Sequence, residues 1–353
     1  MDAETGWNQR QLLGSVQKEI FKMGITYAKI KERLWRELVQ HMCNTVLSSY
    51  IYRSYWHYLF HHKREYNPNE LYYSAHPNQG AGIGHQMANW IAGYWYAKQF
   101  GLKFAHLPFS SKQWEDFLGF GINETTVKEL KQRKYKVRKL PLFNANNEKE
   151  IAINKKIIQS YSGEKVVFIA EQDQFYEEQH GVMKDIKRKF YSAPARKNDK
   201  LIYSKENFNI AIHVRRGDIM ADPSNPNLAM RYLSNDYYKK ALQQVIDSIK
   251  IDKPIHIYLF SQGIPEDYPE FAHYKNIHWC LDMSAQDSFL HMVYADLLIT
   301  SKSSFSYKPA LLSNGIKVCP KYFWHGYPDT EDWILCDNDG TLNVIKLKDI
   351  IHE

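Results

Sequence analysis

The stretch IAIHVRRGD, residues 210–218, begins the part of the chain that decides its fold. Its first half is a short apolar run typical of a buried strand, and similar runs follow at 255–260, 297–300 and 316–319. Helical patterns separate these runs, at 237–249, 284–294 and 305–312. Strands that alternate with helices predict a parallel sheet covered on both faces, and such sheets bind ligands at the carboxyl ends of their strands.

A second α/β pattern precedes this one and starts near Leu71. Tyr72 and Tyr73 indicate a strand, and the glycine loop GAGIGHQ at 80–86 then leads into a helix with an apolar stripe. The apolar run at 166–170 predicts a buried strand. Between and after these elements we expect charged helical segments around 128–139 and an interdomain linker over 184–205, which is highly charged and contains Pro194.

Length and composition favour a soluble protein of two domains. The chain has 353 residues, 44% of them hydrophobic and 24% charged, and single cores rarely grow beyond about 300 residues. The net charge of +7 suits anionic partners such as nucleotide phosphates, nucleic acid or acidic lipid. The four cysteines form no C-x-x-C pair, so neither a zinc knuckle nor a disulfide framework is indicated. Without a signal-peptide pattern or a long apolar run, we expect a cytoplasmic protein, or one associated peripherally with a membrane.

Residues 9–63 contain almost no Gly or Pro and predict a helical N-terminal region. Basic and apolar positions alternate there, and two interpretations stay open. The basic residues form a solvated face over a packed one, or the region rests on anionic lipid. The positions concerned are Lys18, Lys22, Lys29, Lys31, Arg33 and Arg36, interleaved with Ile20, Ile25, Ile30, Trp35 and Leu38.

Three segments could hold an anion. Arg215 and Arg216 end a strand, where two guanidiniums could bind a diphosphate, or could form surface ion pairs with Asp218. The glycine loop opens a helix whose free N–H groups could face a phosphate, although a tight turn also explains its glycines. The segment SKSSFS at 301–306 follows another strand as a second anion cradle, or supplies a plain helix N-cap from Ser303 or Ser304.

These segments together resemble the α-1,2-fucosyltransferase family. The likeness rests on HVRRGD at 213–218, LSNDYYKKAL at 233–242, FS at 260–261, SSFS at 303–306 and GIGHQ at 82–86, in that family's spacing. It covers roughly 77–315 and leaves the first 70 residues outside.

The resemblance implies a GT-B architecture of two facing Rossmann-like domains. We expect a helical region at 1–70, an acceptor-side domain at 71–195 and a nucleotide-sugar-binding domain at 196–353. It also implies a hexosyltransferase that moves fucose from GDP-fucose to a hydroxyl of an oligosaccharide or polysaccharide, with inversion, in α-1,2 linkage and without a metal or other cofactor.

The resemblance also implies roles for individual residues. Arg215 would hold the donor phosphate and stabilise its charge during transfer. Independently of the resemblance, Asp218 is the nearest candidate for the catalytic base, or else an ion-pair partner of Arg216. The remaining donor contacts would come from His213, Arg216, Gly82, Gly84, His85, Gln262, Ser303, Ser304 and Phe305.

The chain departs from the family pattern at three places. His85 stands where the family has Asn, Gln262-Gly263 replaces an Asp pair, and Tyr307-Lys308 replaces two Trp. A carboxylate is the usual partner of guanine, so the loss of the Asp pair leaves another nucleotide sugar open as the donor. A protein hydroxyl as the acceptor is a further alternative. A non-catalytic anion or nucleic-acid binder is an alternative of another class. The position of Arg215 and Arg216 in a strand-end turn favours a pocket, so we expect no nucleic-acid partner.

Overall fold

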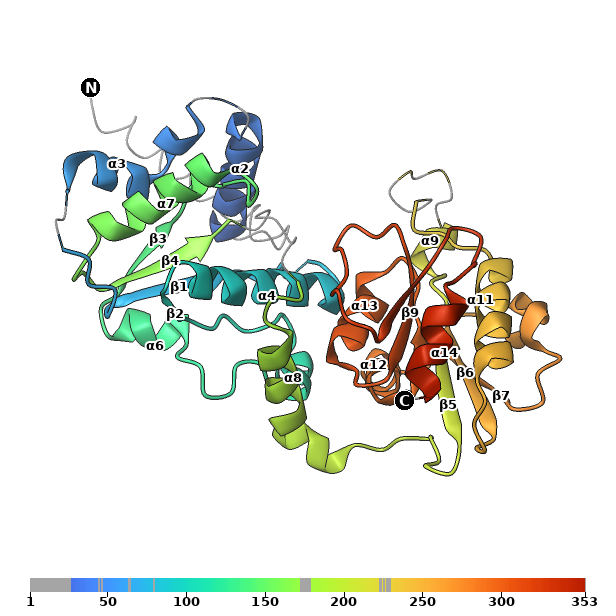
Figure 1. Ribbon diagram of the computed structural model, residues 1–353. Coiled ribbons are helices and arrows are strands. Elements are labelled where there is room, and N and C mark those ends of the chain that lie inside the picture. The colour runs from blue at the N-terminus through green and yellow to red at the C-terminus, as the bar shows by residue number, and fades with distance from the viewer. Residues whose placement is uncertain are drawn as a thin grey trace, which may run out of the picture.

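The computed structural model describes residues 27–352 except 44, 46, 63–64, 79, 172–178, 222–223, 225 and 227–229. Two parallel sheets, each with helices packed on it, lie side by side and are joined by helices between them (Figure 1). A layer of helices from the N-terminal part of the chain lies against the first sheet. This arrangement confirms the predicted α/β fold of two Rossmann-like domains with a helical N-terminal region.

The C-terminal sheet contains six parallel strands in the order β10-β9-β8-β5-β6-β7. The strands are β5 (Phe208–His213), β6 (Ile255–Ser261), β7 (Ile277–Leu281), β8 (Leu297–Ile299), β9 (Ile316–Pro320) and β10 (Trp333–Cys336). Counted from its own first strand, the sheet has the order 6-5-4-1-2-3 of doubly wound folds. The strand order therefore reverses between β5 and β8, which is where such sheets bind their ligands.

Helices cover both faces of the C-terminal sheet, as predicted. On one face lie α11 (Asn235–Ser248) and α14 (Val344–His352), and on the other lie α12 (Ala285–Tyr294) and α13 (Ser304–Leu312). The short helix α9 (Asp218–Ala221) follows β5 directly. The even positions of β5, Ile210 and Ile212, pack toward α11, whereas Ala211 packs toward α12 and α13.

The N-terminal sheet has four parallel strands in the order β2-β1-β4-β3. They are β1 (Leu71–Ala75), β2 (Lys103–Phe104), β3 (Lys136–Lys139) and β4 (Val166–Ala170). One face is covered by α4 (Ile83–Gln99) and α7 (Glu148–Ser160), and the other by α6 (Val127–Gln132). The helix α5 (Lys112–Leu118) lies beyond β2.

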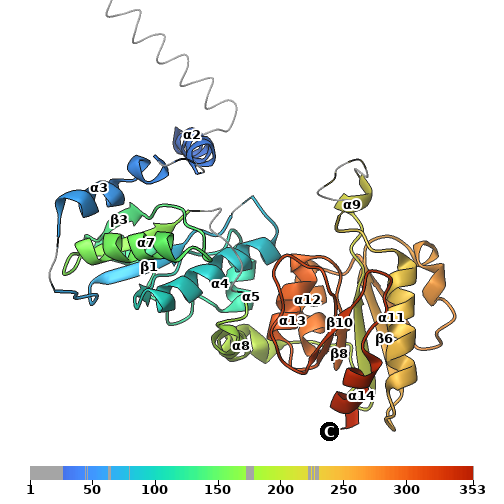
Figure 2. The same cartoon turned by 45° about the horizontal axis from the view of Figure 1, so that its top comes forward.

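The helical N-terminal region appears as α2 (Tyr27–Met42), the 3-10 turn η1 (Ser48–Ile51) and α3 (Arg53–Phe60). The positions predicted to be helical before residue 27 lie outside the described residues. On α3, Ser54 Oγ donates to the carbonyl of Lys139 at 2.6 Å, and the His57 ring stacks on Tyr161 at 3.7 Å. These contacts attach the region to β3 and α7 of the N-terminal domain (Figure 2).

Two sequence predictions were wrong in part. The segment predicted to be helical over 128–139 ends its helix at Gln132, and Lys136–Lys139 is the edge strand β3. The predicted linker over 184–205 begins inside α8 (Met183–Ser192), which is followed by the 3-10 turn η2 (Pro194–Asn198). Lys184 and Arg188 are exposed, while Ile186 and Phe190 are fully buried, so a charge-rich sequence concealed an amphipathic helix.

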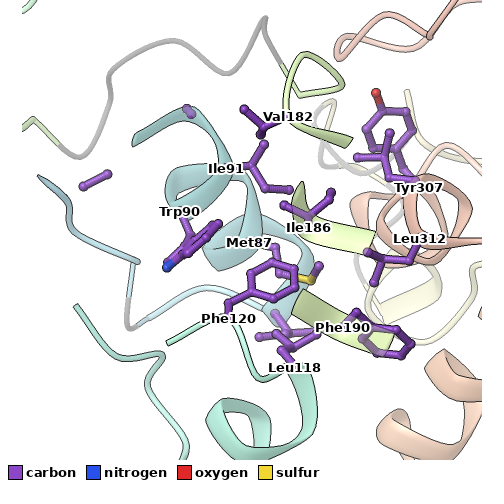
Figure 3. Packing of buried hydrophobic residues seen from close by; sticks show 14 of the residues in the cluster. Met87, Trp90, Ile91, Leu118, Phe120, Val182, Ile186, Phe190, Tyr307 and Leu312 are labelled. Atoms are coloured by element: carbon purple, nitrogen blue, oxygen red, sulfur yellow. The ribbon is translucent and has the colours of Figure 1, made fainter. Parts of the chain in front are cut away.

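The two domains share one hydrophobic cluster. Met87, Trp90 and Ile91 of α4 meet Ile186 and Phe190 of α8, and this group continues to Tyr307 and Leu312 of α13 in the other domain (Figure 3). Polar contacts run through the same junction. The completely buried Lys308 Nζ donates to Gln179 Oε1, whose amide Nε2 donates to the Ala88 carbonyl of α4 at 3.2 Å. The contact between the domains is therefore packed rather than solvated.

Candidate functional site

The two cation- and hydroxyl-rich segments meet at the point where the C-terminal sheet reverses its order. HVRRGD begins at the last residue of β5 and SKSSFS follows β8, and these strands are neighbours in the sheet. His213 Nδ1 lies 2.8 Å from Ser301 Oγ, and Arg215 Nη1 donates to Ser303 Oγ at 2.8 Å. The structure thus brings together two of the three segments that the sequence singled out.

Ser303 fixes both the turn and Arg215. Its hydroxyl caps α13 by accepting from the Phe305 N–H at 3.2 Å, and the same oxygen accepts from Arg215. The side chain is completely buried. The N-cap interpretation is therefore correct for Ser303, and the cap also sets the direction of the half-buried guanidinium.

The glycine loop of the N-terminal domain completes the site. Gly82 is the N-cap of α4, and Gln86 holds the loop because its Nε2 donates to the Ala81 carbonyl at 2.8 Å. A Cβ on Gly84 would lie 2.6 Å from the backbone C and O of Ser304. Only a residue without a side chain lets α4 approach α13 so closely, which brings two helix N-termini from different domains together.

A cleft of about 480 Å³ opens where these helix ends meet. It is lined by Ala81, Gly82, Ile83, Gly84, His85, Arg215, Arg231, Ser304, Phe305, Trp324 and His325. Among these described lining residues two are arginines and none is acidic. Helix N-termini carry partial positive charge, so the cleft is electropositive and could hold an anion with more than one negative charge.

Three residues of the cleft were missed by sequence reasoning. The Arg231 guanidinium lies 5.2 Å from the centre of the Trp324 ring, and His325 Nε2 lies 3.2 Å from Ser304 Oγ. Trp324 and His325 follow β9, so the rule that ligands bind at strand ends pointed to them. Arg231 lies in the long connection between α9 and α11, where no sequence pattern marks it.

The departures Tyr307 and Lys308 lie behind the cleft. The buried Tyr307 ring stacks on His325 at 5.2 Å, and Lys308 faces the junction between the domains. Burial lowers the pKa of Lys308 well below its usual value. These two side chains support the cleft from behind.

His213 is held in its neutral form. Burial, and then the nearby charge of Arg215, lower its pKa from 6.5 to about 3. The ring lies against Ser301 and, at 5.5 Å, the ring of Phe305, rather than in the lining of the cleft. The structure therefore places His213 beneath the serine turn, where it orients Ser301, and leaves the cationic role to Arg215.

Arg216 binds backbone carbonyls and the start of α11 through its guanidinium and is not part of the described lining of the cleft. Its Nη1 donates to the carbonyl of Leu233 at 3.1 Å, and its guanidinium lies 4.7 Å from the Tyr232 ring. The structure therefore does not place Arg215 and Arg216 around one anion. Arg216 fixes the start of α11, and only Arg215 of the pair lines the cleft.

Gln262 and Asp218 were the remaining candidates. Gln262 is exposed just after β6, and its Oε1 would lie 3.1 Å from a Cβ on Gly217, whose φ of +60° favours glycine. Gln262 therefore lies against the HVRRGD turn and is not among the described lining residues of the cleft. The backbone of Asp218 starts α9, and its side chain lies outside the described residues.

The residues described here offer no ready metal site. No group of three or more His, Cys, Asp or Glu side chains in the described part of the chain is placed to hold a metal ion.

No protein-family model matches the chain, and no curated protein matches it significantly. Among solved structures, POFUT1 in complex with GDP is similar over 74% of this chain and 99% of its own, at 12% identity and a TM-score of 0.42. NodZ alpha-1,6-fucosyltransferase co-crystallized with GDP is similar over 77% of this chain and 97% of its own, at 12% identity and a TM-score of 0.43. The fucosyltransferase NodZ from Bradyrhizobium is similar over 77% of this chain and 97% of its own, at 11% identity and a TM-score of 0.41.

Proposed function

We propose that this protein is an inverting glycosyltransferase that moves fucose from GDP-fucose to a hydroxyl of a glycan, in α-1,2 linkage. One observation carries the proposal. The cleft between the two domains is lined by Arg215, Arg231 and two helix N-termini, with no acidic residue among its described lining residues. Such a cleft matches a nucleoside diphosphate, whose negative charge grows when the sugar leaves.

The proposed reaction is a direct displacement. The acceptor oxygen forms a bond to the anomeric carbon while the bond from that carbon to the β-phosphate oxygen breaks, and GDP leaves with the electron pair. Arg215 and the N–H groups of the first turns of α4 and α13 stabilise the developing charge, an effect worth a few kcal/mol per donor in comparable sites. The acceptor proton passes to a base, and Asp218 is our candidate because α9 begins directly after the HVRRG turn.

The donor is tested by hydrolysis in the absence of an acceptor. The protein should slowly hydrolyse GDP-fucose, and should hydrolyse GDP-mannose and UDP-sugars far more slowly, both with Mg²⁺ and in excess EDTA. GDP should raise the melting temperature more than UDP or ADP. Equal shifts from the three nucleotides would contradict the guanine assignment, and loss of activity in EDTA would contradict metal independence.

The acceptor and linkage need a separate experiment. Incubation with GDP-fucose and a panel of oligosaccharides should yield a product whose NMR spectrum shows an α-1,2-linked fucose. Because the donor carries fucose in the β configuration, an α product reports inversion. Transfer to a protein hydroxyl but to no glycan would favour the alternative acceptor, and protection by single-stranded DNA without any hydrolysis would favour a binding protein.

A further inference from the structure

The N-terminal helical layer exposes an unusual amount of apolar surface. Of the 20 exposed large hydrophobic side chains among the described residues, eight belong to the short segment 27–66. They are Tyr27, Leu34, Leu38, Leu47, Tyr50, Trp56, Phe60 and Tyr66. Scattered single residues of this kind are normal on a surface, but such a concentration marks a contact with a partner.

One side of helix α2 contacts the N-terminal domain, and the other side is exposed to solvent. Its Trp35 Nε1 donates to Glu171 Oε1 at 2.8 Å, at the carboxyl end of β4, and this contact holds the helix to the domain. Tyr27, Leu34 and Leu38 are 80%, 60% and 43% exposed. With Lys31 they follow the spacing i, i+4, i+7, i+11, so they form one continuous stripe along the helix.

A groove of about 700 Å³ runs beside this stripe, between α2, the start of α3 and β3. Leu34, Leu38 and Ile51 supply apolar walls. The charged lining residues are the basic Lys31, Arg53, Arg138 and Lys139 and the single acidic Glu32. Lys139 pairs with Glu171 at 2.8 Å, whereas Lys31 and Arg53 are exposed and form no ion pair within the described part of the chain.

Exposed aromatic rings continue the surface along η1 and α3. Tyr50, Trp56 and Phe60 are 42%, 44% and 73% exposed, and the Trp56 ring lies 5.7 Å from Tyr50 and 6.1 Å from Phe60. Trp56 Nε1 also donates to the Tyr50 carbonyl at 2.7 Å. Aromatic rings with a polar edge are the residues that favour the interface between lipid and water.

We propose that α2, η1 and α3 form a docking surface for an anionic lipid bilayer. Lys31 and Arg53 would meet the lipid phosphates, while the stripe of α2 and the rings of α3 enter the headgroup region. No described helix is long and apolar enough to cross a membrane, so these elements lie on the surface rather than span it. The positive rim argues for lipid over a second copy of the chain, because two like-charged rims would repel.

The docking surface lies on the same side of the molecule as the helix that follows the Arg215 turn. In both views α2 and α9 lie on the same side of the molecule (Figures 1 and 2), and α9 follows the turn that carries Arg215. Docking would therefore turn that side toward the bilayer. The inference does not depend on the proposed reaction and can fail or succeed without it.

Vesicle flotation of the full chain tests the docking. The protein should float with vesicles in which a third of the phosphatidylcholine is replaced by phosphatidylserine, and not with pure phosphatidylcholine. Binding should weaken as salt is added, because salt screens exposed charges. The double variant Lys31→Glu and Arg53→Glu should weaken binding about 25-fold or more, since each basic side chain near an anionic surface is worth about fivefold.

A matched control reverses the same amount of charge elsewhere. Lys128→Glu together with Lys131→Glu alters exposed positions on α6, which covers the opposite face of the N-terminal sheet, and should keep most of the binding. Trp56→Ser together with Phe60→Ser removes the exposed rings and should weaken binding even at low salt. All three variants should keep a melting temperature near that of the wild type, which shows that they are folded.

Several results would overturn the inference. Equal flotation with neutral and anionic vesicles, no flotation at all, or an equal loss in the α6 control would each exclude the surface. If the wild type self-associates and the ring variant abolishes this without changing flotation, the face is instead a contact between copies. A missing GDP response with intact flotation would contradict the proposed function and leave the docking surface standing.

Discussion

Replacing His213 with asparagine should make the stability of the protein less sensitive to acid. The imidazole is buried beside Ser301, and burial followed by the charge of Arg215 lowers its pKa to about 3. In the unfolded chain the pKa returns to about 6.5. Asparagine keeps a short polar side chain near Ser301 and does not titrate.

The difference between the two pKa values means that acid lowers the free energy of unfolding of the wild type. Because the pKa of His213 is lower in the folded state than in the unfolded state, protons bind the unfolded chain more readily. The contribution of the neutral ring is fully present above pH 6.5 and is lost as the pH falls toward 3. Between pH 7 and pH 5 the linkage relation gives a loss of about 2 kcal/mol from this residue alone.

Urea unfolding of both proteins at several pH values between 5 and 7 measures the effect. The wild type should lose about 2 kcal/mol more than His213→Asn over this range, whatever the other groups contribute. Ser301→Ala is the control, since it removes the hydrogen-bond partner but leaves the titrating ring. It should lower stability at each pH and keep the acid sensitivity. Parallel pH profiles for wild type and His213→Asn would refute the assignment of a buried neutral imidazole.

Three further predictions concern the cleft. Arg215→Lys should remove most GDP-fucose hydrolysis while the melting temperature stays near that of the wild type, because an ammonium cannot make the two-point phosphate contact; a third of wild-type turnover would contradict this. Gly84→Ala should cost about 1–3 kcal/mol in urea unfolding, because its Cβ meets the Ser304 backbone at 2.6 Å, whereas Gly82→Ser, with nothing within 4 Å, should not destabilise. In calorimetric titrations Gln262→Leu should weaken GDP binding by about 1–3 kcal/mol, Gln262→Asp should bind GDP at least as well, and UDP should be indifferent to both; an unchanged GDP affinity in Gln262→Leu would place base recognition elsewhere.

The strands that the sequence predicted share one property. Each of them, β1, β4, β5, β6, β8 and β9, has a neighbouring strand on both sides, and its side chains are mostly buried. The four strands that were not predicted, β2, β3, β7 and β10, are the edges of the two sheets. An edge strand such as Lys136–Lys139 meets solvent along one side, so its sequence shows charge where an interior strand shows a continuous apolar run.

The parts of the site that lie next to a predicted strand or helix could be predicted from the sequence. Arg215, Ser304 and the glycine loop stand next to a predicted strand or helix, and the structure brings them into one cleft. The different directions of Arg215 and Arg216 depend on Leu233 and Tyr232, which lie well downstream in the chain, so adjacent residues could not reveal them. Arg231 lies in the connection between α9 and α11, outside any helix or strand, so no local pattern marks it. The roles of these residues in donor binding remain predictions.

The hydrophobic cluster through α4, α8 and α13 decides how the molecule can be divided. A cut in the connection after α8 would leave α13 with an uncovered apolar side in one fragment and α4 and α8 with another in the partner fragment. Each fragment would then expose a hydrophobic surface that is buried in the intact protein, so the fragments should remain soluble only when they are produced together. We therefore expect the two sheets to melt as a single cooperative unit.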